Sequence, residues 1–338
     1  MKTLILQKPG RLTLGESPPP APPGPGEAVV RVRRVGICGT DIHAYRGDQP
    51  YFSYPRILGH ELGVEITDLG ENEKGLKIGD RCAVEPYLDC GRCIACRRGR
   101  PNCCVSLQVL GVHTDGGMRD YITVPVEKLH RSERLSLEQL ALVETLTIGA
   151  HAVARAALES GEWVLVIGAG PIGLGVIRFA QIAGARVMVT DLSDERLEFA
   201  RQHFGVEFTL RGGENPEKQV EEITEGDFPS AVFDATGSAP SMSSALRYVA
   251  HSGRLIFVGL VQADVSFSDP EFHRREATLL SSRNATAAEF QQVLTLMEAG
   301  TLDPTVWTTH RALCTNLVEE FPRWVEPGAG LLKGLVEF

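Results

Sequence analysis

Hydrophobic and polar residues alternate with a period of two in short segments throughout the N-terminal part of the chain. This alternation is typical of half-buried β-strands. It predicts strands at residues 1–6, 12–15, 28–35, 62–69, 81–85 and 121–124. A Pro-rich connection at residues 17–26 separates the second strand from the third, and glycine-bearing turns separate the later ones. We therefore expect a β-rich domain here.

The pattern changes at about residue 147, where buried strands begin to alternate with amphipathic helices. Strands are predicted at residues 163–167, 186–190, 231–234 and 254–258, and helices at residues 171–183, 193–203 and 240–251. Such alternation indicates a doubly wound parallel sheet with helices on both faces. A further helix at 286–299 and a last strand at 331–338 complete the chain. The fold class is therefore α/β, in two domains.

Composition excludes several classes of partner. The 338 residues carry a formal net charge of −9, which argues against nucleic acid or anionic membrane as a partner. No signal peptide is expected, and the longest apolar run, residues 163–177, is too short to span a bilayer. Eight cysteines without a secretion signal are typical of a reducing compartment, so we expect a cytoplasmic protein.

Four of these cysteines lie within one short, glycine-bearing stretch. Their spacing is C-x2-C-x2-C-x7-C, formed by Cys90, Cys93, Cys96 and Cys104. Four thiolates at this spacing suit one tetrahedral zinc with no open position. An iron–sulfur cluster would favour a shorter last gap ending in Cys-Pro, and disulfides would need an oxidising compartment. The stretch predicts a structural zinc site, with Cys103 as a spare thiol.

A glycine-rich turn joins the predicted strand at 163–167 to the helix that follows. Its G-x-G-x-x-G pattern is formed by Gly168, Gly170, Pro171, Ile172 and Gly173. The first glycine permits a tight turn, the second lets the backbone approach a pyrophosphate, and the third lets the helix pack closely on the strand. The alternative is an ordinary strand–helix turn that binds nothing. The position between strand and helix favours a dinucleotide site.

The residues after this turn indicate which dinucleotide is bound. Asp191 follows Gly173 by 18 residues and ends the second strand, where a carboxylate accepts hydrogen bonds from ribose hydroxyls. The same charge repels a 2′-phosphate, so NAD is expected rather than NADP. Arg196, one helical turn further on, is placed to reach the ribose or to offset Asp191.

A second candidate metal site lies upstream of the four cysteines. Cys38 and His60 each adjoin a glycine, and a thiolate with an imidazole is a common pair of zinc ligands. Taken alone, either residue is more often structural. Beside a dinucleotide domain, they favour a reactive zinc that keeps one position open for a substrate.

Together these motifs resemble zinc-dependent medium-chain alcohol dehydrogenases, and within them the sorbitol and threonine dehydrogenase branch. The resemblance rests on G-I-C-G-T-D-x-H at 36–43, G-H-E at 59–61, the cysteine quartet with its G-x-x-N-x-C ending at 99–104, and G-A-G-P-I-G at 168–173. It covers essentially the whole chain. Residues 143–151 carry Glu144 where the classical enzymes carry a second zinc cysteine, and Thr145 where the polyol branch usually has proline.

The resemblance implies a set of roles. Cys38, His60 and Glu144 would bind the reactive zinc, and Glu61 would sit behind it, entering only when water or substrate leaves. Thr40 would touch the substrate oxygen, His43 would continue the proton relay, and Asp41 would hydrogen-bond His60. Residues 1–147 and 284–338 would form a GroES-like catalytic domain, and residues 148–283 a Rossmann NAD-binding domain. The family also implies two zinc ions per chain and a homodimer or homotetramer.

The expected activity is transfer of a hydride to NAD from a secondary hydroxyl of a polyol or sugar acid. Polar residues expected near the cleft support a polyhydroxylated substrate: Tyr45, Arg46, Asp48, Gln49, Glu85, His113, Thr114 and Asp115. Arg46 or Arg119 would pair with a substrate carboxylate. The alternatives are an L-threonine 3-dehydrogenase or another alcohol dehydrogenase, a zinc-free reductase of the same fold, and a non-enzymatic protein that keeps only cofactor binding.

Overall fold

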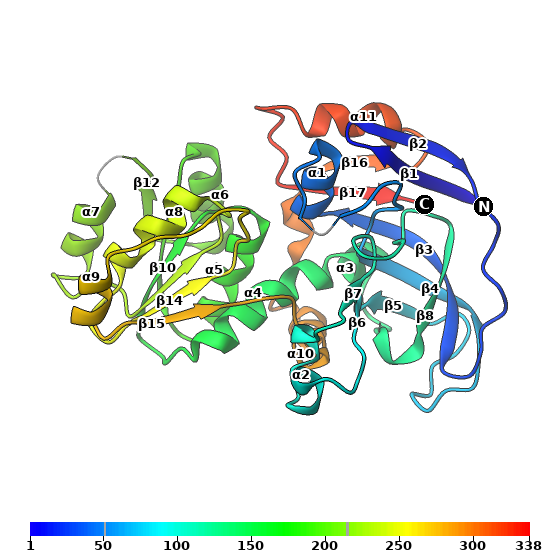
Figure 1. Ribbon diagram of the computed structural model, residues 1–338, viewed down its shortest axis with the longest axis horizontal. Helices are drawn as coiled ribbons and strands as arrows, with labels where there is room; N and C mark the ends of the chain where they lie inside the picture. Colours follow the sequence, from blue (N-terminus) through cyan, green and yellow to red (C-terminus); the bar gives the residue numbers. More distant parts are fainter. Residues whose placement is uncertain (51, 214–215) are drawn as a thin grey trace. The chain divides into compact units, whose positions relative to one another are not determined.

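The structure, a computed structural model, describes residues 1–50, 52–213 and 216–338 (Figure 1). The chain divides into two compact units. The first unit joins Met1–Thr145 to Ala285–Phe338, and the second is Leu146–Asn284. The predicted domain boundaries, after residues 147 and 283, lie within two residues of these divisions. Helix α4 (Val143–Ala156) carries the chain from the first unit into the second.

The first unit is mainly β-structure. Its N-terminal segment contains β1 (Lys2–Lys8), β2 (Arg11–Glu16), β3 (Glu27–Ile37), α1 (Gly39–Arg46), β4 (Glu61–Leu69), β5 (Arg81–Val84), β6 (Tyr87–Leu88), α2 (Ile94–Arg97), η1 (Pro101–Cys103), β7 (Gln108–Val109), β8 (Tyr121–Pro125), η2 (Val126–Lys128), β9 (Leu129–Arg131) and α3 (Leu137–Ala141). Its C-terminal segment contains α10 (Ala287–Glu298), η4 (Pro304–Trp307), β16 (Thr308–Leu313), α11 (Leu317–Trp324) and β17 (Lys333–Glu337).

The long strand β3 organises this unit. The main sheet runs in the order β16-β17-β3-β4-β5-β9, and β8 also pairs with β3. Along β3, Arg31 is exposed, whereas Val29, Val30 and Val32 are buried; because neighbouring side chains point to opposite faces, part of the strand is covered on both. Strand β17, near the C-terminus, lies beside β3 in the sheet, as the red and blue arrows in Figure 1 show. The last strand is therefore part of the same core as the first ones.

The second unit has the predicted strand–helix alternation. It contains β10 (Trp163–Ile167), α5 (Pro171–Ile182), β11 (Arg186–Asp191), α6 (Asp194–Phe204), β12 (Phe208–Arg211), α7 (Pro216–Ile223), β13 (Ala231–Asp234), α8 (Ala239–Ser244), η3 (Ala245–Tyr248), β14 (Arg254–Phe257), α9 (Asp269–Arg274) and β15 (Thr278–Ser281). The six strands are parallel in the order β12-β11-β10-β13-β14-β15. This is the doubly wound dinucleotide-binding order, so the predicted α/β fold class is confirmed.

Several elements differ from the prediction. The helix expected at 240–251 is α8 followed by the 3₁₀ segment η3, so regular α-helix ends at Ser244. The segment after Cys38, for which no helix was predicted, forms the eight-residue helix α1. Helix α11 contains Pro322, which hid it from a helix assignment by sequence. These differences move individual side chains without changing the architecture.

A close backbone approach fixes α3 against the sheet just beyond His60 and Glu61. Gly63 lies in β4, and a Cβ atom built there would overlap the carbonyl oxygen of Leu137 at the start of α3. Gly15, in β2, has open space at the same position and an ordinary backbone conformation. The two glycines therefore give a matched pair of alanine substitutions.

We predict that Gly63→Ala destabilises the protein by about 2 kcal/mol or more, because a backbone carbonyl cannot move aside as a side chain does. Gly15→Ala should leave stability unchanged or slightly raised. Thermal unfolding of both variants, followed by circular dichroism, checks this. Equal melting temperatures for the two variants would contradict it.

Candidate active site and metal centres

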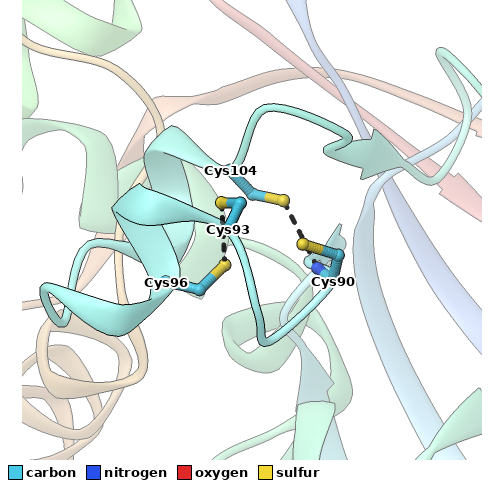
Figure 2. A group of neighbouring side chains, drawn as sticks. All are labelled: Cys90, Cys93, Cys96 and Cys104. Atoms are coloured by element: carbon cyan, nitrogen blue, oxygen red, sulfur yellow. Dashed lines mark hydrogen bonds between the residues drawn. The ribbon is translucent and has the colours of Figure 1, made fainter.

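The four cysteines of the quartet converge in one loop. Cys93 precedes α2, Cys96 lies within it, and Cys104 follows η1. Figure 2 shows the side chains of Cys90, Cys93, Cys96 and Cys104 pointing toward one another. Their sulfur atoms all lie within 4.8 Å of each other, which suits a single tetrahedral ion. Cys103 is exposed and lies outside the cluster.

Backbone amides prepare part of this cluster for a metal. The N–H groups of Cys96 and Val105 lower the pKa of the Cys93 thiol to about 6, because they stabilise the thiolate. Burial and the neighbouring thiols raise the pKa of Cys96 to about 12. Cys96 lies 3.6 Å from the Asp89 carboxylate, which also bonds Lys128 at 3.0 Å. A divalent cation would offset the repulsion among four converging thiolates, so this donor set fits zinc.

A second cluster forms where β3 ends and β4 begins. The ligand atoms of Cys38, His60 and Glu61 lie within 4.8 Å of one another. Cys38 is the residue before α1, and His60 immediately precedes β4, whose first residue Glu61 pairs with Gly36 of β3. Because β3 and β4 are hydrogen-bonded neighbours, the sheet itself brings the thiol and imidazole together. The structure thus places two motifs 22 residues apart in sequence at one site.

Asp41 lies beside His60 with a different bond from the one that the resemblance implies. Its Oδ1 atom is 4.0 Å from His60 Nδ1, which is longer than a hydrogen bond. Its Oδ2 atom accepts a hydrogen bond from the Cys38 N–H at 2.9 Å. Both Oδ1 of Asp41 and Nδ1 of His60 are buried without a hydrogen-bond partner in the described residues. Asp41 therefore orients the Cys38 backbone directly and faces the imidazole only across a gap.

Glu61 of this cluster and the neighbouring Glu144 each have a hydrogen-bond partner of their own. Glu61 accepts hydrogen bonds from Lys333 Nζ at both oxygens, at 2.7 and 2.9 Å. Glu144 accepts a hydrogen bond from the Tyr87 hydroxyl. Glu144 is not among the three residues with converging ligand atoms. The fold thus gathers Cys38, His60 and Glu61 directly, and Glu144, the third ligand that the resemblance implies, lies outside this trio.

The electrostatics of this cluster favour a bound dication. Burial lowers the pKa of His60, but the Cys38 thiol, Asp41 and Glu144 outweigh burial and raise it well above its ordinary value. Burial also raises the pKa of Asp41 and of Glu144. Three buried carboxylates thus surround one imidazole and one ammonium, and buried charged groups are paired or bind metals. The thiolate, imidazole and carboxylate are also the donor types that zinc prefers.

The two residues of the expected proton relay lie on α1. Thr40 is in the first turn and is partly buried, and His43 is exposed further along the helix. His43 Nδ1 lies 3.0 Å from the Asp48 carboxylate. This contact favours a proton on Nδ1, which would leave the other ring nitrogen to accept one.

Most of the polar residues expected around the substrate have structural roles instead. The Tyr45 hydroxyl donates to Gly10 O, Arg46 donates to Val325 O at 2.7 Å, and Arg119 donates to Gly116 O. Asp115 accepts from the Ile57 N–H and pairs with Arg56, and His113 Nδ1 accepts from the Val109 N–H. These loops lack regular ladders, so side chains satisfy their backbone groups.

Glu85 is the clearest correction. It is buried, with Lys128 Nζ at 2.8 Å from one oxygen and His130 Nε2 at 3.1 Å from the other. Burial opposes its ionisation, yet these bonds lower the pKa of Glu85 below its ordinary value. Both carboxylate oxygens of Glu85 are therefore engaged by residues of its own domain. The sequence argument for a polyhydroxylated pocket from these residues is therefore weakened.

The glycine-rich turn has the geometry that its sequence predicts. Gly168 has φ +98°, Gly170 precedes α5, and Pro171 is the first residue of the helix. A side chain at Gly173 would overlap the carbonyl oxygen of Gly168, so α5 can approach β10 only with glycine there. Ile172 lies in the same first turn. The turn thus places the N-terminus of α5 just beyond the carboxyl end of β10.

Asp191 ends β11 next to this turn. Its Oδ2 accepts a hydrogen bond from the Ala169 N–H at 2.7 Å, and its Oδ1 accepts one from the Ser193 N–H at 2.8 Å. Arg196 Nη1 lies 3.9 Å from the same carboxylate and borders Gly170. Asp191 therefore ties the glycine-rich turn to the next loop, while Arg196 stands beside both.

Comparisons with known proteins identify the family. The model of the alcohol dehydrogenase GroES-like domain matches residues 24–134, and that of the zinc-binding dehydrogenase matches residues 171–299. The chain is 42% identical over 338 residues to L-galactonate-5-dehydrogenase of Escherichia coli K12, covering 100% of this chain and 99% of the relative. The chain belongs to the zinc-dependent alcohol dehydrogenases.

Two other comparisons extend this result. A 2-dehydro-3-deoxy-L-galactonate 5-dehydrogenase from Pseudoalteromonas atlantica is 33% identical over 83% of each chain. The structure of the alcohol dehydrogenase RspB from Escherichia coli CFT073, complexed with NADH, has a TM-score of 0.92 at 30% identity, covering 100% of this chain and 99% of that one.

The resemblance read from the motifs is thus confirmed, as is the GroES-like domain beside the dinucleotide-binding sheet. This dehydrogenase uses zinc and NAD and acts on a small molecule. Within the described part of the chain, we find no helix with the length and apolar character that crossing a membrane requires.

The two metal clusters should respond differently to loss of a ligand. We predict that Cys38→Ser leaves a folded dehydrogenase with one zinc per chain and no turnover, because only the reactive ion is lost. Cys93→Ser should lower the melting temperature, because metal binding supports the loop. Zinc content by atomic emission, thermal unfolding and NAD reduction check both variants. Full activity of Cys38→Ser would refute the assignment of a reactive zinc to Cys38. Unchanged stability and zinc content of Cys93→Ser would refute the assignment of a structural zinc to the cysteine quartet.

Cofactor choice should depend on Asp191. We predict that Asp191→Ala raises KM for NAD by roughly tenfold to a hundredfold, since a charge-assisted hydrogen bond contributes about 1.5–3 kcal/mol. KM for NADP should fall in the same variant. Asp194→Ala, which removes an exposed carboxylate from the next helix, is the matched control. Steady-state kinetics with both cofactors decide it; wild-type preference for NADP would overturn the prediction.

Proposed function

We propose that this dehydrogenase oxidises a secondary hydroxyl of a six-carbon sugar acid, with L-galactonate at carbon 5 as the substrate. The observation that carries the proposal is the 42% identity, from end to end, with an L-galactonate-5-dehydrogenase. The convergent Cys38, His60 and Glu61 ligands supply the centre that such a reaction needs. Neutral polyols and L-threonine are the alternative substrates of this branch.

The roles of the chain's own residues follow from their positions. When bound, zinc would acidify the substrate hydroxyl, and NAD would accept the hydride from the adjacent carbon. Cys38 and His60 would hold the metal, with Glu61 or Glu144 as the carboxylate ligand. Thr40 would take the hydroxyl proton, and His43, held by Asp48, would pass it on to solvent.

Cofactor binding would use the second unit. The backbone N–H groups of the turn at residues 168–173 would hold the pyrophosphate. The Asp191 carboxylate would accept hydrogen bonds from the ribose hydroxyls. Its negative charge supports NAD over NADP as the preferred form. Arg196 would border the ribose from the neighbouring helix.

The cellular compartment and the oligomeric state of the enzyme are also proposals. The chain has eight free cysteines, and four of them converge on one candidate zinc site. This supports a location in the reducing cytoplasm. The family resemblance supports a homodimer or homotetramer.

A substrate panel tests the proposed activity. We predict that kcat/KM for NAD-dependent oxidation is highest for L-galactonate and at least roughly tenfold lower for sorbitol and L-threonine, because each unmatched buried polar group costs about 1–3 kcal/mol. The epimer of L-galactonate at carbon 5 is the matched control, since it changes only the reacting centre. Higher kcat/KM for simple primary alcohols than for every sugar acid and polyol would refute the proposal.

A further inference from the structure

Glu61 of the reactive cluster and the neighbouring Glu144 have hydrogen-bond partners of different kinds. Glu61 is held at both oxygens by the ammonium of Lys333, whereas Glu144 accepts a hydrogen bond from a neutral phenol, Tyr87. An ammonium neutralises a carboxylate and draws it toward itself. A phenol directs a carboxylate but leaves its charge in place. The Tyr87 hydroxyl therefore fixes the position of the Glu144 carboxylate without an ion pair.

Glu144 lies within the electrostatic reach of the reactive cluster. Burial raises its pKa, and among the neighbouring groups His60 has the largest opposing effect. Glu61 and Lys333 also act on it, with opposite signs. Thr145, the next residue, shares the Lys333 ammonium with Glu61 of the cluster, while Tyr87 holds the Oε1 atom of Glu144.

Tyr87 is itself held firmly. Its side chain is buried, and its ring meets Phe290 of α10 edge to face, with centroids 6.4 Å apart. Phe290 also stacks on His130, whose other contact is the buried Glu85. Burial and Glu144 raise the pKa of Tyr87 well above its ordinary value, so the phenol retains the proton that it donates.

The backbone of Tyr87 belongs to the cysteine loop. Tyr87 pairs with Val109 in the short β6–β7 ladder, and the chain between these strands contains Cys90 and Cys104. The Cys90 N–H donates to the Cys104 sulfur at 3.3 Å, which joins the two sides of the loop (Figure 2). Only two residues separate Tyr87 from Cys90. Closure of the loop therefore limits where Tyr87 can lie.

We propose that Tyr87 is a positioning residue for the reactive zinc: its hydroxyl holds the Glu144 carboxylate beside the Cys38–His60 pair, and the closed cysteine loop holds Tyr87. This inference rests on the proposed function insofar as that function requires a metal at this cluster. It assigns the structural loop a second role, because the loop supports a residue that shapes the other metal centre.

Release of zinc to a chromogenic chelator tests the inference without measuring turnover. Tyr87→Phe keeps the ring against Phe290 and removes only the hydroxyl. Tyr54→Phe is the matched control, because it removes another hydroxyl of the same unit, one that donates to the carbonyl of Ala44. Cys38→Ser, which retains only the structural ion, identifies the slower phase of release.

Tyr87→Phe should still bind two zinc ions but release one of them roughly tenfold to a hundredfold faster than wild type. Loss of a hydrogen bond that holds a metal ligand in place typically weakens metal binding by that factor. Tyr54→Phe should release both at wild-type rates. Wild-type release of both ions from Tyr87→Phe would overturn the proposal.

A double-mutant cycle separates positioning from packing. If Tyr87 acts through Glu144, adding Tyr87→Phe to Glu144→Gln should not accelerate zinc release further. Equal acceleration in both backgrounds would show that Tyr87 acts through packing, and the proposal would fail. Because the readout is zinc release, an inactive enzyme on the substrate panel would refute the proposed substrate while leaving this result intact.

Discussion

The buried ion pair between Lys333 and Glu61 is the interaction on which the reactive site depends. Lys333 Nζ also donates to the carbonyl of Ile37 and to the Thr145 hydroxyl, both at 3.2 Å. One ammonium therefore joins the end of β3, the start of β4, the start of α4 and the last strand. Burial alone would lower its pKa, but Glu61 and Cys38 raise it, so it remains charged. Removing one partner of such a pair costs about 3–5 kcal/mol, because it leaves an uncompensated buried charge.

The sequence predicted the parts of the molecule that local patterns encode. The parallel sheet followed from strands of continuous apolar residues such as β10, and the glycine-rich turn from glycines whose backbone positions exclude a side chain. Cys38 and His60 were recognisable because a family motif surrounds each. The short strands β12 and β15 escaped notice because, unlike β13, they are not buried along their length and lack a continuous apolar run.

The partners of these residues were not predictable in the same way. Lys333 lies 272 residues from Glu61, and Tyr87 lies 57 residues from Glu144. No local signal links such pairs, because the sheet topology alone brings them together. The polar residues after His43 misled the sequence analysis for a related reason. Irregular loops also need polar side chains for their own backbone, and sequence does not distinguish this use from substrate binding.

The dependence on Lys333 also bears on the order in which the molecule can be built. The second unit is one continuous segment that precedes β17, so all of its residues are available before the last strand of the first unit is synthesised. Domains generally fold as units during synthesis. Until β17 arrives, β3 lacks a neighbour and Glu61 lacks its ammonium. The nascent enzyme would therefore complete its dinucleotide-binding half first and acquire its reactive centre only as translation of the final strand ends.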